Sequence, residues 1–289
     1  MSEKSSGPGE SSGFPEPGSH DPGGLPPVPP DSEVGMGFRN SVELPSLTLI
    51  ATPIGNLGDL TLRAVDVLRR CDALIAEDTR RAAQLLNHLG IRKPLVSFHE
   101  HNEERRLPEL MNRFRAGEKL ALVTDAGTPS VSDPGFRLVR ACLASGIGYT
   151  VLPGPSAVIT ALVGSGLPPV PFSFGGFLPS SGSGRRSELR KAAALGDTSI
   201  YFESPHRLVD CLEDLVGIAP LSQVCVAREL TKIHEEYRRG NPAELAAHYS
   251  ENPPRGEITL VIDPDPSREP MGRKKKAYSE NTPIPRNFA

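Results

Sequence analysis

The sequence predicts an α/β fold made of two α/β domains. Between residues 47 and 153, short apolar runs of strand length alternate with amphipathic stretches of helical length. The runs are almost continuously apolar, which is typical of parallel strands that helices cover on both faces. After PGPSA (153–157) the regular alternation changes, and this turn divides the core about evenly. We therefore expect one domain over residues 47–152 and a second over residues 153–263.

In the first domain the alternation predicts five strands and four helices. The expected strands are LTLIA (47–51), ALIAE (73–77), PLVSF (94–98), KLALVT (119–124) and YTVLP (149–153). In TLRAVDVLRRC (61–71) apolar residues recur three and four positions apart, which predicts a helix. Further helices are expected over RRAAQLLNHLG (80–90), which Gly90 closes, over 103–116 and near 136–145.

The second domain is expected to begin with a helix and to continue through FSFGGFLP (172–179) into a polar loop, SSGSGRR (180–186). The remaining expected elements are a helix at 187–195, the strand TSIYFE (198–203), a helix at 205–216, and the strands QVCVARE (223–229) and GEITLVI (256–262).

Both ends of the chain differ in composition from the core. Residues 1–46 are rich in Gly, Pro and Ser, so they can bury too little apolar surface to offset the entropy of ordering. Residues 264–289 contain the basic run Arg273, Lys274, Lys275 and Lys276. We expect both segments to be disordered tails.

The composition excludes several classes of protein. A formal net charge of -3 argues against binding of nucleic acid or membrane by bulk attraction. The four cysteines lie far apart in the sequence, so buried, reduced thiols are expected rather than a zinc site. No apolar run has the length of a membrane span, and the N-terminus lacks the layout of a secretory signal. A cytoplasmic enzyme is the simplest expectation.

Three glycine-bearing loops follow strands of the first domain, at the edge where parallel α/β sheets bind ligands. They are TPIGNLGD (52–59), TDAGTPSVSDPG (124–135) and PGPSA (153–157). We expect them to converge, although Gly and Pro in any one loop could serve only a tight turn. Neither GxGxxG nor a P-loop occurs in the core, which argues against nucleotide phosphate. The second loop has Asp125, Ser132 and Asp133, and its Ala126-Gly127-Thr128 segment allows the backbone to come close to a ligand. These features suit adenosine with a cationic amino-acid tail.

A resemblance to a known enzyme family rests on motifs that occur in the family's order. They are TPIGNLGDLTLRA, AEDTRR, HEHNEERR, LVTDAGTPSVSDPG, PGPSA, GFLP, YFESPHRL, ARELTKIHEE and RGEI. On these motifs the chain resembles the small-subunit ribosomal RNA methyltransferase I group of the tetrapyrrole methylase superfamily, the class III methyltransferases. The resemblance implies a two-domain enzyme, usually a homodimer, that binds S-adenosylmethionine in a cleft between its domains. It also implies 2′-O-methylation of a cytidine ribose in the decoding region of 16S rRNA, within the small ribosomal subunit.

The three loops and the resemblance together give the expected cofactor-binding residues. They are Pro53, Gly55, Asn56, Asp125, Ala126, Gly127, Thr128, Val131, Ser132, Pro153, Gly154, Ser156 and Phe202. Phe202 comes from a strand of the second domain, where it could lie over the cofactor or simply pack in the core.

A ribose hydroxyl is a poor nucleophile, so a nearby proton acceptor is expected. Glu77, Asp78, His101 and Asn102 are the candidates, because they follow strands of the first domain. Asp78 could instead cap the next helix, and His101 and Asn102 could belong to a solvated loop. His99 and His101 alternate and would share a strand face, but no third ligand accompanies them, so no metal is expected.

Basic side chains near strand ends are expected to contact RNA phosphates. They are Arg80, Arg185, Arg186, Arg207, Arg228 and Lys232. Where the family generally has a Lys soon after GFLP, this chain has SSGSG, and Arg185 and Arg186 are expected to take over that role. The alternatives are ion pairs of Arg207 with Glu203 and of Arg228 with Glu229.

Two other functions remain open from the sequence. A small-molecule tetrapyrrole methylase shares the fold and the cofactor cleft, and an inactive ribosome-binding protein could keep the fold alone. The segments AEDTRR, HNE, SDPG, ESPHR and RELTK favour the RNA group, whereas the intact glycines and Asp125 favour an active enzyme.

Overall fold

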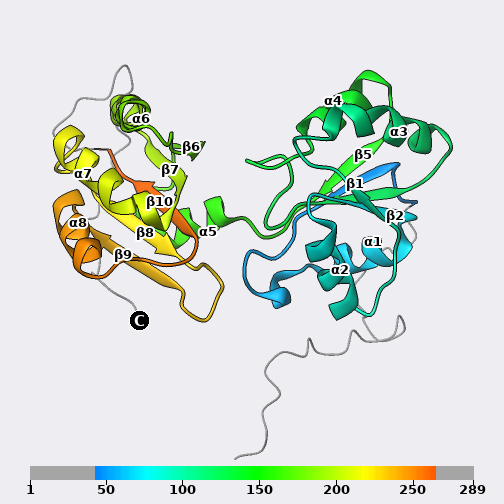
Figure 1. The fold of residues 1–289 in the computed structure, drawn as a ribbon, viewed down its shortest axis with the longest axis horizontal. Coiled ribbons are helices and arrows are strands. Elements are labelled where there is room, and N and C mark those ends of the chain that lie inside the picture. The colour runs from blue at the N-terminus through cyan, green and yellow to red at the C-terminus, as the bar shows by residue number, and fades with distance from the viewer. Residues whose placement is uncertain (1–42, 265–289) are drawn as a thin grey trace, which may run out of the picture. The chain divides into compact units, whose positions relative to one another are not determined.

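The computed structural model of the protein describes residues 43–264 (Figure 1). The expected tails, 1–46 and 264–289, lie outside the described residues except for 43–46 and 264, and the basic run lies outside them entirely. Two five-stranded sheets organise the described chain. The predicted domain boundary at residue 153 falls between the two sheets and stays a prediction.

The first sheet is entirely parallel, with the strand order β3-β2-β4-β1-β5. Its strands are β1 (Leu47–Ile50), β2 (Ala73–Ala76), β3 (Leu95–Ser97), β4 (Leu120–Val123) and β5 (Tyr149–Leu152). Its helices are α1 (Leu62–Arg70), α2 (Thr79–His88), α3 (Glu103–Arg115) and α4 (Phe136–Ala144), and the 3₁₀ turn η1 (Leu57–Asp59) precedes α1. The five strands and four helices predicted from the sequence are confirmed, with ends that differ by one or two residues.

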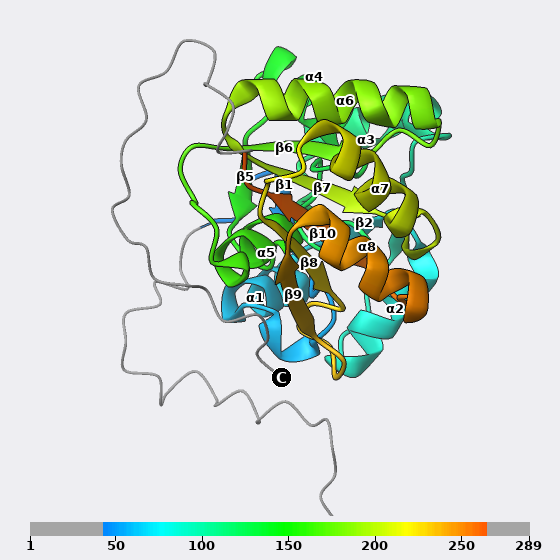
Figure 2. The same ribbon diagram turned by 90° about the vertical axis from the view of Figure 1, so that its left-hand side faces the viewer.

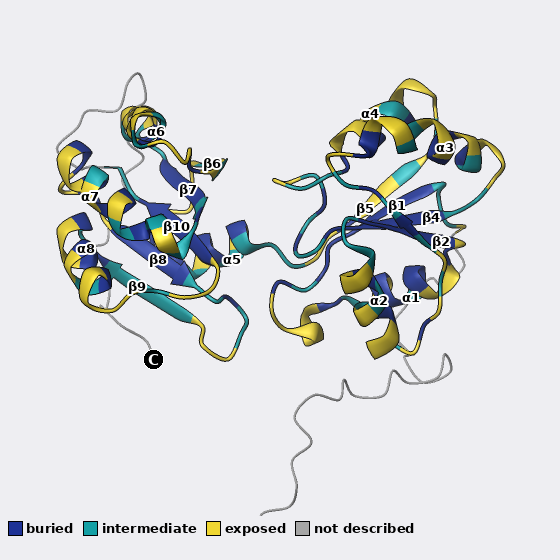
Figure 3. Cartoon of the chain, viewed as in Figure 1, coloured by how far each residue is buried: buried dark blue, intermediate teal, exposed yellow. Residues whose placement is uncertain are grey.

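Alternate residues of the central strands supply two separate cores. Leu74 and Ala121 pack on the side of α1 and α2, whereas Ala73 and Leu120 pack on the side of α3 and α4. Figure 3 shows the central strands of this sheet coloured as buried. Because both faces are covered, the strands are apolar throughout, which is the pattern seen in the sequence. All five carboxyl ends meet at one edge of the sheet, and the loops that follow the strands leave from there.

The second sheet is mixed, with the order β6-β7-β10-β8-β9, and only β6 and β7 run parallel. Its strands are β6 (Phe172–Phe177), β7 (Thr198–Glu203), β8 (Val224–Arg228), β9 (Glu236–Gly240) and β10 (Ile258–Ile262). Its helices are α5 (Ala157–Ser165), α6 (Gly182–Leu195), α7 (Leu208–Ile218) and α8 (Pro242–Glu251), and η2 (Pro205–Arg207) precedes α7. One face carries α6, α7 and α8, of which Figure 2 shows α7 and α8 in front of the sheet.

The other face of the second sheet packs against α5, an almost wholly apolar helix. Ile54, from the loop after β1, joins the same core and lies with Val158 and Leu230. This burial ties the first glycine-bearing loop to the second half of the chain.

The structure corrects the sequence prediction in the second half at two places. SSGSGRR is not a loop, because α6 begins at Gly182 and the Ser181 hydroxyl accepts a hydrogen bond from the backbone N–H of Gly184. Gly182 and Gly184 are poor helix formers, so the sequence did not indicate that a helix begins here. The sequence reasoning also missed β9 and α8. The segment of β9, EYRRG, has only one apolar side chain and forms a half-buried edge strand, so it shows no hydrophobic alternation.

A further correction concerns the two histidines of the first half. β3 ends at Ser97, so His99 and His101 lie in the loop beyond it and share no strand face. Their ring centroids are 6.0 Å apart in an edge-to-face arrangement.

The four cysteines, Cys71, Cys142, Cys211 and Cys225, are buried free thiols, as the sequence predicts. Burial raises the pKa of Cys211 and of Cys225 to about 12, so both stay protonated at neutral pH. Within residues 43–264, no three or more His, Cys, Asp or Glu side chains are grouped so that they could hold a metal ion. In the same range no helix is long and apolar enough to cross a membrane.

Two helical glycines offer a matched test of the packing between α5 and β9. A methyl group added at Gly164 meets the ring of Tyr237, whereas one added at Gly217 in α7 meets nothing within 4 Å. We expect Gly164→Ala to lower the free energy of unfolding by about 1–3 kcal/mol through overpacking. Gly217→Ala should raise it by roughly 0.5–1 kcal/mol, because alanine is the better helix former. Urea unfolding measures both values, and shifts of the same sign would argue against the close approach of α5 to β9.

Candidate active site

Hydrogen bonds join the three glycine-bearing loops. The N–H of Thr52 donates to the carbonyl of Gly127 at 2.9 Å, and the N–H of Gly127 donates to the carbonyl of Thr52 at 3.0 Å. The Thr52 hydroxyl donates to the Thr124 carbonyl at 3.1 Å, and the Thr128 hydroxyl donates to the Pro155 carbonyl at 3.2 Å. The loops that follow β1, β4 and β5 therefore converge at one edge of the first sheet, as predicted.

Two of the glycines are needed for this close approach. Gly127 has a φ of +79°, a left-handed conformation that side chains other than glycine rarely adopt. A Cβ atom at Gly154 would lie 2.9 Å from the Cβ of Ala51 and would push the third loop away from β1.

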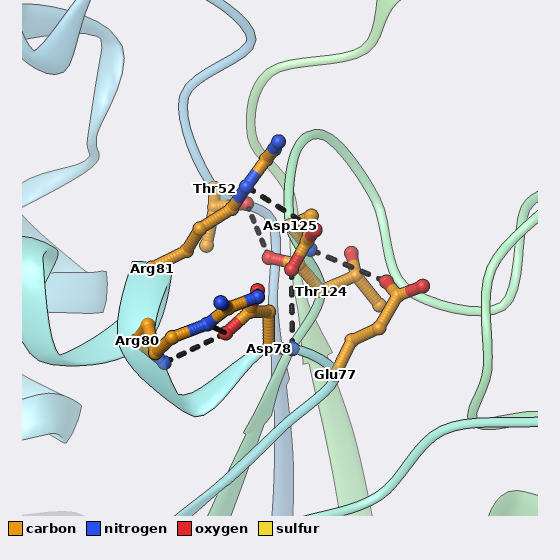
Figure 4. Close-up of polar contacts among 7 residues, drawn as sticks. All are labelled: Thr52, Glu77, Asp78, Arg80, Arg81, Thr124 and Asp125. Carbon is orange, nitrogen blue, oxygen red and sulfur yellow. Dashed lines mark hydrogen bonds and ion pairs between the residues drawn. The ribbon is translucent and has the colours of Figure 1, made fainter.

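A cavity of about 370 Å³, the strand-end cavity, opens where β1, β2 and β4 end (Figure 4). Its apolar lining includes Pro53, Leu57 and Leu85, and its polar lining consists of Thr52, Glu77, Asp78, Arg81, Gln84, Thr124 and Asp125. α2 supplies one wall through Arg81 and Leu85, and its N-cap Asp78 lies two residues after the end of β2. The site is thus assembled from segments that are distant in sequence but adjacent at the sheet edge.

Asp125 connects the elements around the strand-end cavity. Its carboxylate accepts a hydrogen bond from the backbone N–H of Asp78 at 3.2 Å and pairs with Arg81 Nε at 3.4 Å. Its own backbone N–H donates to a Glu77 carboxylate oxygen at 3.5 Å. The Asp125 side chain is 30% exposed, so a ligand in the cavity can reach it.

Asp78 is the N-cap of α2, so the alternative role considered from the sequence is confirmed. Its carboxylate accepts from the backbone N–H of Arg80 at 2.8 Å and holds the Arg80 guanidinium at 3.1 and 2.7 Å. Hydrogen bonding to the Arg80 side chain lowers the pKa of Asp78 to about 2. A carboxylate that is stabilised as an anion in this way is a poor proton acceptor.

Two other carboxyl groups at this edge, those of Glu77 and Asp133, have a raised pKa. Burial, reinforced by the charge of Asp125, raises the pKa of Glu77. Burial, reinforced by the charge of Glu77, raises the pKa of Asp133 to about 7. Desolvation and mutual repulsion therefore disfavour full ionisation of the cluster, and a bound cation would relieve both effects.

A second cavity of about 490 Å³ lies beside the third loop. Gly154, Pro155, Ser156 and Thr160 line it together with Ile54 and Thr231. Pro53 and Ile54 are adjacent residues that line different cavities, so the loop after β1 separates the two spaces.

The loop after β1 is pressed against the segment that follows β8. A Cβ atom at Gly55 would lie 2.8 Å from both the Leu230 carbonyl and the Thr231 hydroxyl, and it would also meet Lys232. Thr231 has a φ of +64°, which is a strained conformation for a β-branched residue. Its buried hydroxyl has no hydrogen-bond partner within the described range. Strain and an unsatisfied polar group of this kind are typical of ligand sites.

The expected cofactor residues divide into several groups. Pro53 and Asp125 line the strand-end cavity, and Gly154 and Ser156 line the second cavity. Gly55, Ala126, Gly127, Thr128 and Pro153 belong to the converging loops without lining either cavity, and Asn56 caps η1. Val131 and Ser132 are exposed in the second loop. Phe202 packs edge-on to Phe174 and Phe177 at 5.0 and 5.3 Å, in an aromatic cluster that lines neither space.

Only two of the four candidate proton acceptors line the strand-end cavity. Glu77 and Asp78 line the strand-end cavity, whereas His101 is exposed and does not. Asn102 is buried, and its side chain accepts from the backbone N–H of His99 at 2.9 Å and donates to Ser97. These contacts hold the loop after β3, so Asn102 has a local structural role.

All six cations expected to contact RNA are ion-paired within the described chain. Arg207 pairs with Glu203 at 2.6 Å, which confirms that alternative, whereas Arg228 pairs with Glu236 and not with Glu229. Arg186 pairs with Asp214 at 3.3 Å and remains 44% exposed. Lys232 pairs with Glu229 at 2.8 Å and Glu257 at 3.0 Å, and Arg80 pairs with Asp78 at 2.7 Å.

Arg185 requires a correction. Its side chain is only 7% exposed, and Nε lies 2.7 Å from the Asp214 carboxylate. The guanidinium joins α6 to α7 and does not present itself at the surface, so the expected replacement of the family's Lys rests on Arg186 alone.

Sequence reasoning missed four residues that the site contains. Thr52 is the second residue after β1 and Thr124 is the first after β4, and that position at a strand end was the available signal. Arg81 pairs with Asp125, and Thr231 lines the second cavity. No sequence pattern indicated these last two contacts.

A parallel sheet with converging loops at its carboxyl edge, followed by a mixed sheet, is the fold of one class of methylase. The model of the tetrapyrrole (corrin/porphyrin) methylase family matches residues 46–246. A crystal structure of diphthine synthase has a TM-score of 0.61 at 14% identity and covers 75% of this chain and 89% of that chain. The uroporphyrin-III-C-methyltransferase from Thermus thermophilus has a TM-score of 0.52 at 21% identity, over 75% and 94% of the two chains. These two likenesses concern the fold.

Closer relatives refine the class. Ribosomal RNA small subunit methyltransferase I of Thermotoga maritima is 44% identical over 216 residues, which cover 75% of this chain and 97% of that protein. The protein of the same name from Escherichia coli O157:H7 is 44% identical over 226 residues, 77% and 79% of the two chains. The chain therefore belongs to the tetrapyrrole methylase family and, within it, to the ribosomal RNA small subunit methyltransferase I group.

The residues present fit the cofactor of this family, S-adenosylmethionine. The molecule carries a sulfonium and an ammonium group. Glu77 lines the strand-end cavity, Asp133 lies close enough to interact with its charge, and a cation would stabilise both of these desolvated carboxyl groups. The unpartnered Thr231 hydroxyl beside the second cavity can accept or donate one further hydrogen bond.

The affinity for S-adenosylmethionine should fall as the pH drops below about 7. A cation favours the ionised form of Asp133, and protonation removes that charge as the pH falls through the pKa of about 7. Between pH 8 and pH 6 the ionised fraction falls about tenfold, so the affinity should fall by up to about tenfold. Asp133→Asn should bind more weakly at pH 8 and depend less on pH. Calorimetric titrations of both proteins test this, and identical pH profiles would contradict it.

Proposed function

We propose that this methyltransferase transfers the methyl group of S-adenosylmethionine to the ribose 2′-hydroxyl of a cytidine in the decoding region of 16S rRNA. The identity to proteins named ribosomal RNA small subunit methyltransferase I supports the class of substrate. The observation that carries the chemistry is the carboxyl cluster of Glu77, Asp125 and Asp133 at the edge where the three loops converge.

S-adenosylmethionine supplies an activated methyl group on a sulfonium when it is bound. The residues proposed to bind it belong to the converging loops named above, and Asp125 and Gly154 are the most important of them. Their task is to orient the cofactor and to exclude water, since an in-line displacement depends mainly on placement of the reacting atoms. The reciprocal hydrogen bonds of Thr52 and Gly127 support this, because they fix the loops before any ligand binds.

Glu77 is the proposed proton acceptor. It lines the strand-end cavity, and burial together with the charge of Asp125 raises the pKa of its carboxyl group toward the range in which a carboxylate is an effective base. Asp78 is less suited because Arg80 holds it as an anion. The Asn102 side chain is engaged in its own loop, and His101 lines neither cavity.

RNA binding is proposed to use cations at the rim, chiefly Arg80, Arg186, Arg207, Arg228 and Lys232. Each is paired with a carboxylate, and solvent screens the more exposed of these pairs, so that they hold the cation only weakly. A phosphate can therefore compete for the more exposed guanidinium groups, such as that of Arg80, whose side chain is 87% exposed.

The proposed partner is the small ribosomal subunit, which places the enzyme in the cytoplasm. A homodimer is also proposed. Exposed apolar side chains on α5, Ile159 and Val163, and Val151 on the edge strand β5 support an interface between two copies.

The function can be tested with two substitutions that separate cofactor binding from RNA binding. Asp125→Ala should abolish binding of S-adenosylmethionine, because it removes a carboxylate that also organises Asp78 and Arg81. Arg186→Ala should leave that binding unchanged and raise the KM for small subunits roughly 3- to 10-fold. Calorimetry measures the first effect, and transfer of labelled methyl groups to purified small subunits measures the second.

Mapping of 2′-O-methyl groups in the labelled rRNA identifies the nucleotide. Methyl transfer to a uroporphyrinogen-like acceptor but not to small subunits would falsify the proposal in favour of a small-molecule methylase. Binding of small subunits without any methyl transfer would favour an inactive ribosome-binding protein.

A further inference from the structure

A third cavity, of about 440 Å³, lies where β8, β9 and the end of α8 meet, and we call it the α8 cavity. Ligand pockets in proteins typically measure ~300–1,000 Å³. Its polar lining includes Arg228, His234, His248, Tyr249, Asn252 and Arg255, and its apolar lining includes Pro253 and Pro254. It shares no lining residue with the strand-end cavity or the cavity beside Gly154.

Tyr249 in the wall of the α8 cavity has an unsatisfied hydroxyl. The residue is 2% exposed, and the hydroxyl oxygen has no hydrogen-bond partner among residues 43–264, although Arg238 lies near it. A buried hydroxyl without a partner costs roughly 1–3 kcal/mol. The hydroxyl lies below the solvent-accessible surface, so a polar group that enters the cavity supplies the missing hydrogen bond once the wall moves to admit it.

The charged residues of the α8 cavity leave one guanidinium available. Glu236 is neutralised by Arg228 at 3.1 Å and by Arg238 at 2.8 Å, and Glu229 is neutralised by Lys232. Arg255 is exposed and makes no ion pair within the described part of the chain, while its carbonyl accepts from Arg228 at 3.2 Å. The free charge at this cavity is therefore positive, which suits a phosphate group.

The same wall offers flat surfaces for a planar group. The His248 ring packs edge-on to Tyr249 with centroids 4.9 Å apart, and His248 is only half-buried. Next to it, at the end of α8, the Asn252 side-chain N–H donates to the His248 carbonyl at 3.0 Å, which orients the amide so that its oxygen can accept a hydrogen bond, and the two prolines follow. Aromatic rings and amides in this combination are what proteins use to hold unpaired bases of RNA.

One segment connects the α8 cavity with the candidate active site. Glu229 lines the α8 cavity, Thr231 lines the cavity beside Gly154, and both residues have positive φ, +51° and +64°. Lys232 anchors the segment through Glu229 and Glu257. The distance between the two cavities is therefore fixed by a short, tightly held stretch of chain.

We propose that the α8 cavity binds one unpaired nucleotide of the RNA substrate, separate from the nucleotide that is methylated. This rests on the proposed function. Arg255 binds the phosphate, His248 and the prolines contact the base, and Tyr249 and Asn252 bind its polar edge. The cavity thereby contributes to selection of the RNA by local shape and contacts, as a chain with a net charge of only -3 requires.

Variants of the α8 cavity test the proposal through binding, which does not depend on methyl transfer. Arg255→Ala and Tyr249→Phe should each weaken binding of small subunits roughly 3- to 10-fold in co-sedimentation. Both should retain the wild-type affinity for S-adenosylmethionine. Tyr249→Phe should not lower the melting temperature, because the lost hydroxyl has no partner in the free protein.

Arg115→Ala is the matched control, since Arg115 is an exposed arginine at the end of α3, before β4 and so near the opposite edge of the first sheet. Binding by Arg255→Ala and Tyr249→Phe equal to that of Arg115→Ala would overturn the proposal. Saturable binding of free cytidine monophosphate that Arg255→Ala abolishes, with normal binding of small subunits, would also overturn it in favour of a free nucleotide. Failure of the wild type to transfer methyl groups would count against the proposed function and leaves the binding comparison intact.

Discussion

The architecture of the site depends on the reciprocal hydrogen bonds between Thr52 and Gly127. They link the chain just beyond β1 to the chain just beyond β4, where the parallel ladder between these neighbouring strands has ended. The backbone groups that would otherwise lose their partners at the sheet edge are satisfied, and the two loops are held together. Gly127 makes this possible because its left-handed conformation turns the second loop back toward the first. The third loop joins through the Thr128 hydroxyl.

This constraint brings like charges together, at a cost in stability. Glu77 follows β2, whereas Asp125 and Asp133 belong to the loop after β4, and burial with mutual repulsion raises the pKa of Glu77 and of Asp133. A fold selected for stability alone would separate or pair such groups, as it does for Asp78 with Arg80 and for Asp214 with Arg185. Carboxyl groups held in an unfavourable state are instead typical of sites in which a ligand completes the electrostatics. The cationic cofactor of this family fits that requirement.

The sequence allowed the first half of the fold to be predicted almost completely. Hydrophobic runs and helical spacing are local signals, and the covered parallel sheet makes them strong, so even the convergence of the three loops followed from their places after strands. The second half was less predictable. β9 is an edge strand of polar residues, and the start of α6 is hidden by Gly182 and Gly184. The side-chain ion pairs were less predictable still. Arg185 pairs with Asp214, 29 residues away, and Arg228 pairs with Glu236 and not with its neighbour Glu229. Such choices depend on packing between elements, which no local pattern reports.

Backbone amide hydrogen exchange with and without S-adenosylmethionine tests the central claim most directly, because it reports on each loop separately. If the hydrogen-bonded junction of Thr52 and Gly127 organises the cofactor site, bound cofactor should slow exchange in residues 52–59, 124–135 and 153–157 together and leave the end of α8 unchanged. Protection confined to one of these loops, or located in another part of the chain, would contradict the account.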